Sequence, residues 1–179
     1  WSLRGSVCEY NCIFMAGKQP LSSHVQGIYM DGWTSGVTVR GNIVNRASQG
    51  IYTSGGNDNV VVDNVVFSDT RTALNFVGAY GRGSRGTDIL DIRVANVRAV
   101  ADRLVYMYHR HATEALFRNI VFDGISAKTS EPSRLKAAAS RPFEKIVFRN
   151  VDSPAGFSGV NADVTVEGGV FPRVAPEEK

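Results

Sequence analysis

A period of 23 residues between positions 27 and 76 constrains this chain more than any other feature. Self-similarity at a fixed period of about 20 to 50 residues is typical of repeat proteins. Each copy holds two short runs of alternating β-branched residues separated by Gly, Asn, Asp and Ser, which indicates strands and turns and leaves no room for a helix. The positions that match at intervals of 23 are Ile28, Ile51 and Leu74 in one column and Val39 and Val62 in another.

A repeat this short, built only of strands and turns, can close on itself as one turn of a right-handed parallel β-helix. We therefore predict an all-β solenoid of about six rungs, with strands stacked about 4.8 Å apart. The length of 179 residues favours a single domain over residues 1–179, with residues 172–179 as an exit tail. Because a β-helix needs its ends covered, we expect a fragment of a longer β-helix that lacks N-terminal rungs, or end-to-end self-association.

The rung that follows the two matched ones is longer. Leu104 lies 30 residues after Leu74 and is expected to continue the inward column. The Gly- and Arg-rich residues 78–86 account for the extra length, and insertions in solenoids map to loops, often on the binding face. A short helical turn is expected at residues 133–139.

Five residues are expected to have structural roles. Asn64, Asn96 and Asn150 each follow a Val- or Phe-rich strand, so we expect them at one equivalent sharp turn, where Asn tolerates the left-handed backbone. Cys8 and Cys12 are expected to be two small buried hydrophobic residues. A disulfide between them would require the chain to turn, since this spacing on one strand separates the Cα atoms by about 13 Å.

Charge is distributed unevenly along the chain. The formal net charge is +3, but residues 81–150 hold 13 Lys and Arg against 7 Asp and Glu, and residues 151–179 hold 2 against 5. A basic middle can attract an acidic polysaccharide, and a solvated Arg-rich face is the alternative. We predict no nucleic-acid partner, since no binding motif is present and aromatic residues do not interleave with the basic run. No apolar run of about 18 residues occurs, so no membrane partner is predicted.

Strand alternation predicts which side chains share an outer face. If the inward column is Ile28, Ile51, Leu74 and Leu104, the residue after each member points outward. The predicted outer columns are Tyr29, Tyr52, Asn75 and Val105, and beside them Asp31, Ser54, Val77 and Met107, with Arg103 at the edge. Aromatic rings cover the apolar faces of pyranoses, and amides and carboxylates bond hydroxyls, so this face is a candidate sugar-binding strip. The alternative is a tyrosine ladder that only stabilises the stacked strands.

Two parts of the chain resemble the pectin-lyase-like superfamily of right-handed parallel β-helix proteins. Residues 27–32, 35–42 and 55–59 are similar to bacterial β-helix glycosidases, and residues 117–125 and 141–151 resemble the C-terminal rungs of the polygalacturonase family. Together the resemblance covers most of residues 24–151. It implies a secreted or periplasmic protein whose partner is a polysaccharide or oligosaccharide.

The catalytic motifs of polygalacturonases are not retained where the period places them. The Asn-Thr-Asp segment would fall on Val25 and Gln26, the Asp-Asp pair on Ser48 and Gln49, the Gly-His-Gly near Thr72, and the Arg-Ile-Lys on residues 103–105. Only Arg103 matches, and the carboxylates are absent from these positions.

Glycoside hydrolysis usually requires two carboxyl groups, about 5 Å apart for retention or 6.5–9.5 Å apart for inversion. Asp31 on the predicted outer face is the first candidate. Asp69 and Glu114 are candidate partners from loops, and Asp58 is a weaker one because Asp in a turn usually caps the backbone. No carboxylate pair stands out in the sequence.

A polysaccharide lyase needs a base that removes the proton next to a uronate carboxyl group and a cation that neutralises that carboxylate. Arg103 could neutralise the carboxylate, and Tyr52, His109 or His111 could act as the base. The two histidines lie on one side of an extended strand, but a metal site needs a third ligand and only Glu114 is near. We therefore predict neither a metal nor a cofactor.

The resemblance and the residues together favour a glycoside hydrolase that acts on an acidic or plant-type glycan. A non-catalytic glycan-binding or structural β-helix module and a polysaccharide lyase are the alternatives. The candidate catalytic residues are Asp31, Arg103 and His109, and the candidate substrate-binding residues are Tyr29, Tyr52, Asn75 and His111. An acid pair in the folded groove would support the enzyme, and its absence would support the binding module.

Overall fold

The computed structural model describes residues 3–14, 25–32, 34–78, 88–110 and 114–176, and the side chains of residues 68–70 lie outside the description. These residues form strands and turns without a helix, which confirms the all-β expectation. The strands are β1 (Val7–Glu9), β2 (Cys12–Phe14), β3 (Gln26–Met30), β4 (Thr38–Arg40), β5 (Ile43–Asn45), β6 (Gln49–Thr53), β7 (Gly56–Asn57), β8 (Val60–Val62), β9 (Val65–Gly78), β10 (Ile89–Ala95), β11 (Arg98–His109), β12 (Phe117–Thr129), β13 (Ser133–Lys136), β14 (Phe143–Asp152), β15 (Phe157–Val160) and β16 (Ala162–Glu167).

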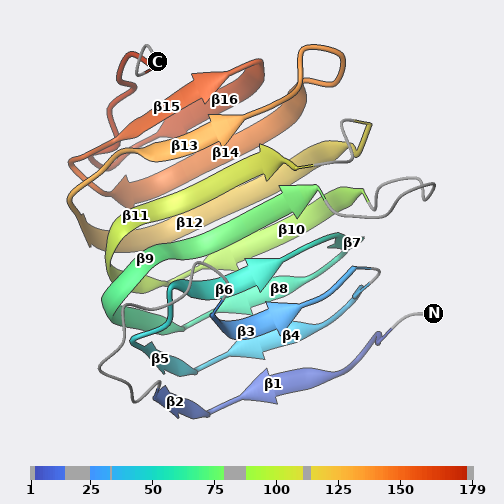
Figure 1. The fold of residues 1–179 in the computed structure, drawn as a ribbon, viewed down its shortest axis with the longest axis vertical. Helices are drawn as coiled ribbons and strands as arrows, with labels where there is room; N and C mark the ends of the chain where they lie inside the picture. The colour runs from blue at the N-terminus through green and yellow to red at the C-terminus, as the bar shows by residue number, and fades with distance from the viewer. Residues whose placement is uncertain (1–2, 15–24, 33, 79–87, 111–113, 177–179) are drawn as a thin grey trace.

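The strands pair in parallel and form three stacks (Figure 1). The first stack runs β1, β4, β8, β10, β12, β14, β16. The second contains β2, β5 and parts of the long strands β9, β11, β12 and β14. The third stack runs β3, β6, β9, β11, β13, β15. Each long strand bends from one stack into the next, so the chain is a layered succession of repeats from its N-terminal to its C-terminal end.

The 23-residue column is confirmed in the third stack, where Ile28 pairs with Ile51 and Ile51 pairs with Leu74. In the first stack the interval between these repeats is 22, because Val39 pairs with Val61 and not with Val62. The extra residue lies in the bend between the second and third stacks, which spans residues 46–48 in one repeat and 68–71 in the next.

The inward column continues through Val105, which pairs with Leu74 at an interval of 31, so the expectation of Leu104 at an interval of 30 is wrong. Strand alternation fails at the bend because two consecutive side chains point inward there. Leu104 and Val105 are both fully buried. The predicted outer residues Val77, Val105 and Met107 are therefore core residues, each 0% exposed.

The interior between the stacks is filled by columns of aliphatic and aromatic side chains. Phe76 packs edge-on against Phe122 at 5.6 Å between ring centroids, and Phe122 stacks on Phe148 at 4.6 Å. Phe171 closes the C-terminal end against Phe148 and Phe157. Burial of an aromatic side chain contributes roughly 1.5–3 kcal/mol, so these columns stabilise the stacking of successive repeats.

Bends at the ends of first-stack strands require a left-handed backbone. Asn96 (φ 51°) and Asn150 (φ 49°) occupy this position, as expected, and Asp63 (φ 57°) occupies it in the preceding repeat. The expectation for Asn64 is wrong: it is fully buried one residue later, where its Oδ1 accepts the backbone N–H of Asn42 at 2.9 Å. Its carboxamide belongs to an internal ladder of amides, since Nδ2 of Asn42 also donates to its Oδ1 at 3.0 Å, and its own Nδ2 donates to the carbonyl of Val62 at 2.9 Å.

Two further expectations are corrected, and a third is not tested. Residues 133–136 form strand β13 and not a helical turn. Cys8 and Cys12 are both free thiols, and Cys12 is exposed rather than buried because β2 lies at an edge of the sheet. The Gly- and Arg-rich insertion falls almost wholly on residues 79–87, which lie outside the described residues.

The C-terminal residues remain attached to the last repeat. Arg173 forms a parallel bridge with Phe157, and the N–H of Val174 donates to the carbonyl of Phe157 at 2.8 Å. Within the described part of the chain, no helix has the length and apolar character needed to span a membrane.

Candidate functional site

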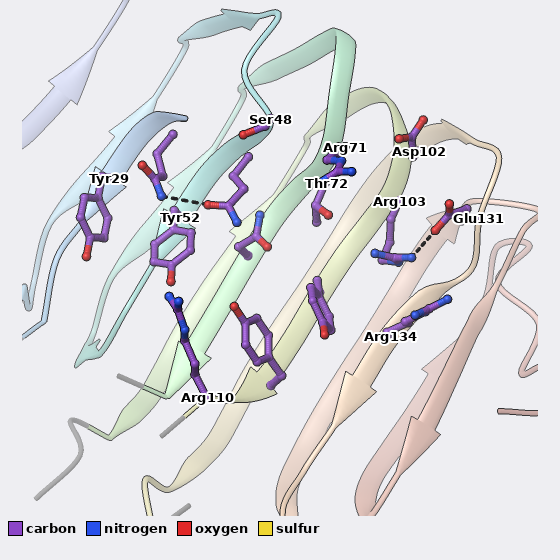
Figure 2. Close-up of a pocket in the computed structure, with 15 residues that line it drawn as sticks. Tyr29, Ser48, Tyr52, Arg71, Thr72, Asp102, Arg103, Arg110, Glu131 and Arg134 are labelled. Atoms are coloured by element: carbon purple, nitrogen blue, oxygen red, sulfur yellow. Dashed lines mark hydrogen bonds and ion pairs between the residues drawn. The ribbon is translucent and has the colours of Figure 1, made fainter. Parts of the chain in front are cut away.

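A cleft of about 530 Å³ runs across the outer face of the third stack (Figure 2). Successive repeats contribute side chains from equivalent positions, because Tyr29, Tyr52 and Asn75 are paired in register across β3, β6 and β9. The column continues through Tyr106 of β11 and Arg134 of β13. The structure thus brings together four of the predicted site residues, namely Tyr29, Tyr52, Asn75 and Arg103.

Four tyrosines line this cleft. Tyr29 and Tyr52 meet edge to face at 5.0 Å with an interplanar angle of 83°. Tyr106 and Tyr108 lie nearly parallel at 4.3 Å with an angle of 22°. Tyr29 is 46% exposed, whereas Tyr52 is only 3% exposed. The cleft therefore offers an exposed ring at one side and packed aromatic walls deeper inside.

Arginine provides most of the charge in the cleft. Arg71, Arg103, Arg110 and Arg134 line it together with two acids, Asp102 and Glu131. Figure 2 shows Arg71 and Asp102 at one end and Arg110 at the opposite end, where it points toward Tyr52. The excess of arginine gives the cleft a positive potential, which attracts anions.

Arg103 is fixed in the wall of the cleft. Its guanidinium pairs with the carboxylate of Glu131 and donates through Nε to the carbonyl of Pro132 at 3.0 Å. The same group lies over the ring of Tyr106, 5.4 Å from the centroid. Arg103 of β11 thus contacts the residues that directly precede β13. It also orients Glu131 and Tyr106 around the cleft.

A polar row lies beside the tyrosine column and continues into Arg103. Gln26 pairs with Gln49, Gln49 with Thr72 and Thr72 with Arg103 in the register of the third stack. The Gln26 amide donates to Oε1 of Gln49 at 3.0 Å. These are positions at which the resemblance placed polygalacturonase motifs, and here they present amides and a hydroxyl to the cleft.

Asn75 has an unusual environment. The residue is 1% exposed, and neither its amide nitrogen nor its carboxamide oxygen has a hydrogen-bond partner among the described residues. Tyr52 and Tyr106 occupy the equivalent positions on either side of it. A buried polar group without a partner is rare in native proteins.

Asp31 lies beside the cleft and is held by its neighbours. Its Oδ1 accepts the hydroxyl of Tyr29 at 2.7 Å, the N–H of Gly32 at 2.8 Å and the hydroxyl of Ser54 at 3.1 Å. The Tyr29 hydroxyl, with smaller effects from the Gly32 N–H and Ser54, lowers the pKa of Asp31 below its ordinary 3.8, against a partly opposing effect of burial. An ionised carboxylate of this kind can accept hydrogen bonds, but it is poorly suited to donate a proton.

His109 points into the protein rather than into the cleft. Its Nε2 lies 2.8 Å from the carbonyl oxygen of Ala115, and its Nδ1 accepts the N–H of Ala138 at 2.9 Å. The ring packs against Phe117 and Phe143, and burial lowers its pKa. With both ring nitrogens engaged, His109 supports the strand ends and is not one of the residues that line the cleft.

The other predicted candidates are dispersed. His111 and the side chain of Asp69 lie outside the described residues. Asp58 forms an exposed ion pair with Arg4 at 2.7 Å, and Glu114 is exposed near the end of β11. No group of three or more His, Cys, Asp or Glu residues that could hold a metal ion occurs where the structure describes the chain.

Comparison of the chain with protein-family models, curated proteins and solved structures finds no match.

Apart from Arg103, sequence reasoning missed the side chains that β11, β13 and the residue after β11 contribute to the cleft. Tyr106, Tyr108, Arg110 and Arg134 line the cleft, although Val105 and Met107 were expected on that face. A signal was present, since the pairs 27–28, 50–51, 73–74 and 104–105 are each two small or apolar residues just before the outward side chain. When these residue pairs are aligned, instead of Leu74 with Leu104 alone, Tyr106 falls in the outward column.

Proposed function

We propose that this chain is a right-handed parallel β-helix of the pectin-lyase-like type, and that its outer cleft binds an anionic polysaccharide. The parallel pairing of equivalent residues in three stacks supports the solenoid, because each repeat contacts the ones before and after it. The observation that carries the function is the joint presence of four tyrosines and four arginines in one cleft.

The tyrosines suit a sugar chain. Aromatic faces and edges pack against the C–H surface of a pyranose. The adjoining Gln26, Gln49 and Thr72 supply donors and acceptors for hydroxyl groups. Because the side chains repeat from one strand to the next, the cleft can contact several sugar units of a linear polymer.

The arginines select for negative charge. A guanidinium binds carboxylate or sulfate through parallel N–H donors, which gives both energy and orientation. Arg71, Arg110 and Arg134 border the cleft in addition to Arg103, which is paired with Glu131. A polymer with one anionic group per sugar unit, such as a polyuronate, matches this arrangement.

Binding without cleavage is the function that these side chains support best. The hydroxyl of Tyr29 and the N–H of Gly32 donate to Asp31 and lower its pKa below the ordinary value. A glycosidase needs one carboxyl group that stays protonated. Asp31 is therefore poorly prepared to protonate a leaving group, and the carboxylate of Glu131 is engaged with Arg103.

Hydrolysis is a second candidate because two carboxylates, Asp102 and Glu131, line the same cleft. The backbone N–H of Glu131 donates to the carbonyl of Asp102 at 2.7 Å, which keeps the two residues together. If the protein is an enzyme, we expect this pair, rather than Asp31, to carry the reaction. Reducing-sugar release by wild type, lost in Asp102→Asn and Glu131→Gln, would support hydrolysis.

The binding proposal is tested with polygalacturonate and the same polymer after full methyl esterification, which removes the charge and keeps the sugar. We expect calorimetric binding to the charged polymer and at least about tenfold weaker binding to the ester. Arg134→Gln should weaken binding to polygalacturonate, while Arg118→Gln, an identical charge change on the first stack, should not. Equal affinity for both polymers, or equal effects of the two substitutions, would refute electrostatic recognition in this cleft.

A further inference from the structure

The unpaired carboxamide of Asn75 is the least explained group in the cleft. Both of its polar atoms are shielded from solvent and lack partners among the described residues. A buried donor or acceptor that is left unpaired destabilises the folded state, because the group has lost its hydrogen bonds to water. Packing alone gives no reason for an amide here, since an apolar residue of similar shape would avoid that cost.

The position of Asn75 points to a ligand. It stands at the middle of the outward column, flanked by Tyr52 and Tyr106, and it lines the cleft. In the neighbouring polar row, by contrast, the Gln26 amide donates to Oε1 of Gln49. Asn75 is thus a fully formed polar group at the centre of the cleft whose partner must come from outside the described chain.

The chemistry of the carboxamide restricts that partner. Its NH₂ group donates and its carbonyl oxygen accepts, so a complete match needs one acceptor and one donor side by side. A carboxylate only accepts and would leave the carbonyl oxygen unpaired. Two adjacent hydroxyl groups on a sugar ring satisfy both atoms, because each hydroxyl can donate and accept.

We propose that Asn75 is a specificity-determining residue that binds a pair of vicinal hydroxyl groups of the sugar unit in the cleft. The inference rests on the proposed function and adds a substrate class to it, namely anionic glycans whose vicinal hydroxyls are unsubstituted. In this proposal, arginine binds the anionic group, tyrosine packs on the sugar ring, and Asn75 forms hydrogen bonds with the free hydroxyls.

Access to Asn75 requires movement of a side chain, because its amide atoms are shielded in this structure. Arg110, an exposed residue that directly follows β11, lines the same cleft and points toward Tyr52, the neighbour of Asn75 in the outward column (Figure 2). A sugar that enters the cleft must displace part of the wall around Asn75 to reach the carboxamide.

Acetylation of the hydroxyls removes the donor that the Asn75 carbonyl needs and adds bulk next to a buried site. We therefore expect the protein to discriminate against O-acetylated polymers. The test compares calorimetric binding of polygalacturonate with that of the same polymer acetylated at its ring hydroxyls, whose carboxylates are unchanged. Wild type should bind the acetylated polymer at least about tenfold more weakly.

The variant Asn75→Leu separates recognition from folding. It should bind unmodified polygalacturonate at least about tenfold more weakly than wild type and should no longer distinguish the two polymers. Its melting temperature should equal or exceed that of wild type, because an unpaired buried amide is replaced by an apolar side chain of similar size. The comparison of the two polymers is made with the wild-type protein, so a folding defect in the Asn75→Leu variant would not conceal its result.

The outcomes distinguish the two proposals. If wild type binds polygalacturonate with equal affinity whether or not it is acetylated, the role of Asn75 is refuted while anionic binding stands. If Asn75→Leu still binds the acetylated polymer more weakly than the unmodified one, another residue recognises the hydroxyls and the inference is again refuted. If wild type binds neither polymer, both the inference and the function on which it rests are overturned.

Discussion

The Nδ1 atom of His109 accepts a hydrogen bond from the backbone N–H of Ala138 at 2.9 Å, across the gap between two repeats. An acceptor nitrogen carries no proton, so the ring is neutral and its proton lies on Nε2, directed at the carbonyl of Ala115 at 2.8 Å. The imidazole thereby joins the end of β11 to the segment that follows β13. His109 is a structural link whose strength depends on its protonation state.

Protonation of His109 should destabilise the protein. Burial, the largest influence, lowers the pKa of His109 below its ordinary 6.5, so the unfolded chain binds a proton more readily than the folded protein does. The free energy of unfolding should therefore fall as the pH drops below about 6.5 towards the lowered folded pKa. Urea unfolding of wild type and His109→Gln at pH values from about 7.5 to about 5 checks this. Identical pH dependence in the two proteins would contradict the assignment.

Salt should weaken binding of an anionic polymer in this cleft. Raising the ionic strength from about 0.05 M to about 0.5 M shortens the Debye length and screens the arginines from the carboxylates. We expect a fall in affinity for polygalacturonate that is smaller in Arg134→Gln than in wild type. Calorimetric titrations at several salt concentrations measure it, with Arg118→Gln as the control that should retain the wild-type dependence.

Gly50 is required by space rather than by backbone conformation. A Cβ at this position would lie 2.5 Å from Cγ1 of Val66 and 2.6 Å from the carbonyl oxygen of Ala73. Gly50→Ala should therefore lower the free energy of unfolding by about 1–3 kcal/mol, since the bend cannot relax without moving the backbone. Chemical denaturation measures the change. Gly159→Ala, whose nearest neighbour would lie at 3.6 Å, is the matched control and should have little effect.

The left-handed bend at Asn96 should reject β-branched residues. Its φ of 51° is accessible to Gly and Asn, whereas a branched Cβ clashes with the backbone there. We expect Asn96→Val to lose roughly 1–3 kcal/mol of stability and Asn96→Gly to lose little. Thermal and urea unfolding of both variants would show it. A similar loss in the two variants would instead assign the role of Asn96 to its exposed bond with Asp63, which lies at 3.1 Å.

The period in the sequence was sufficient to place the first part of the site. Ile28, Ile51 and Leu74 recur at a constant interval of 23, so the residues after them were predicted to stack, and Tyr29, Tyr52 and Asn75 do pair in register. Local alternation determines this because neighbouring strands of equal length must match their inward side chains. The all-β class followed from the same pattern.

Only the tertiary structure decided the rest of the site. The bend before β11 turns both Leu104 and Val105 inward, and this moves Tyr106 instead of Val105 into the column. The direction of His109 and the isolation of Asn75 depend on contacts between repeats that are distant in sequence. Strand alternation predicts which face a side chain lies on only where the strand is straight. After each bend, the packing of the core decides which face the following residues occupy.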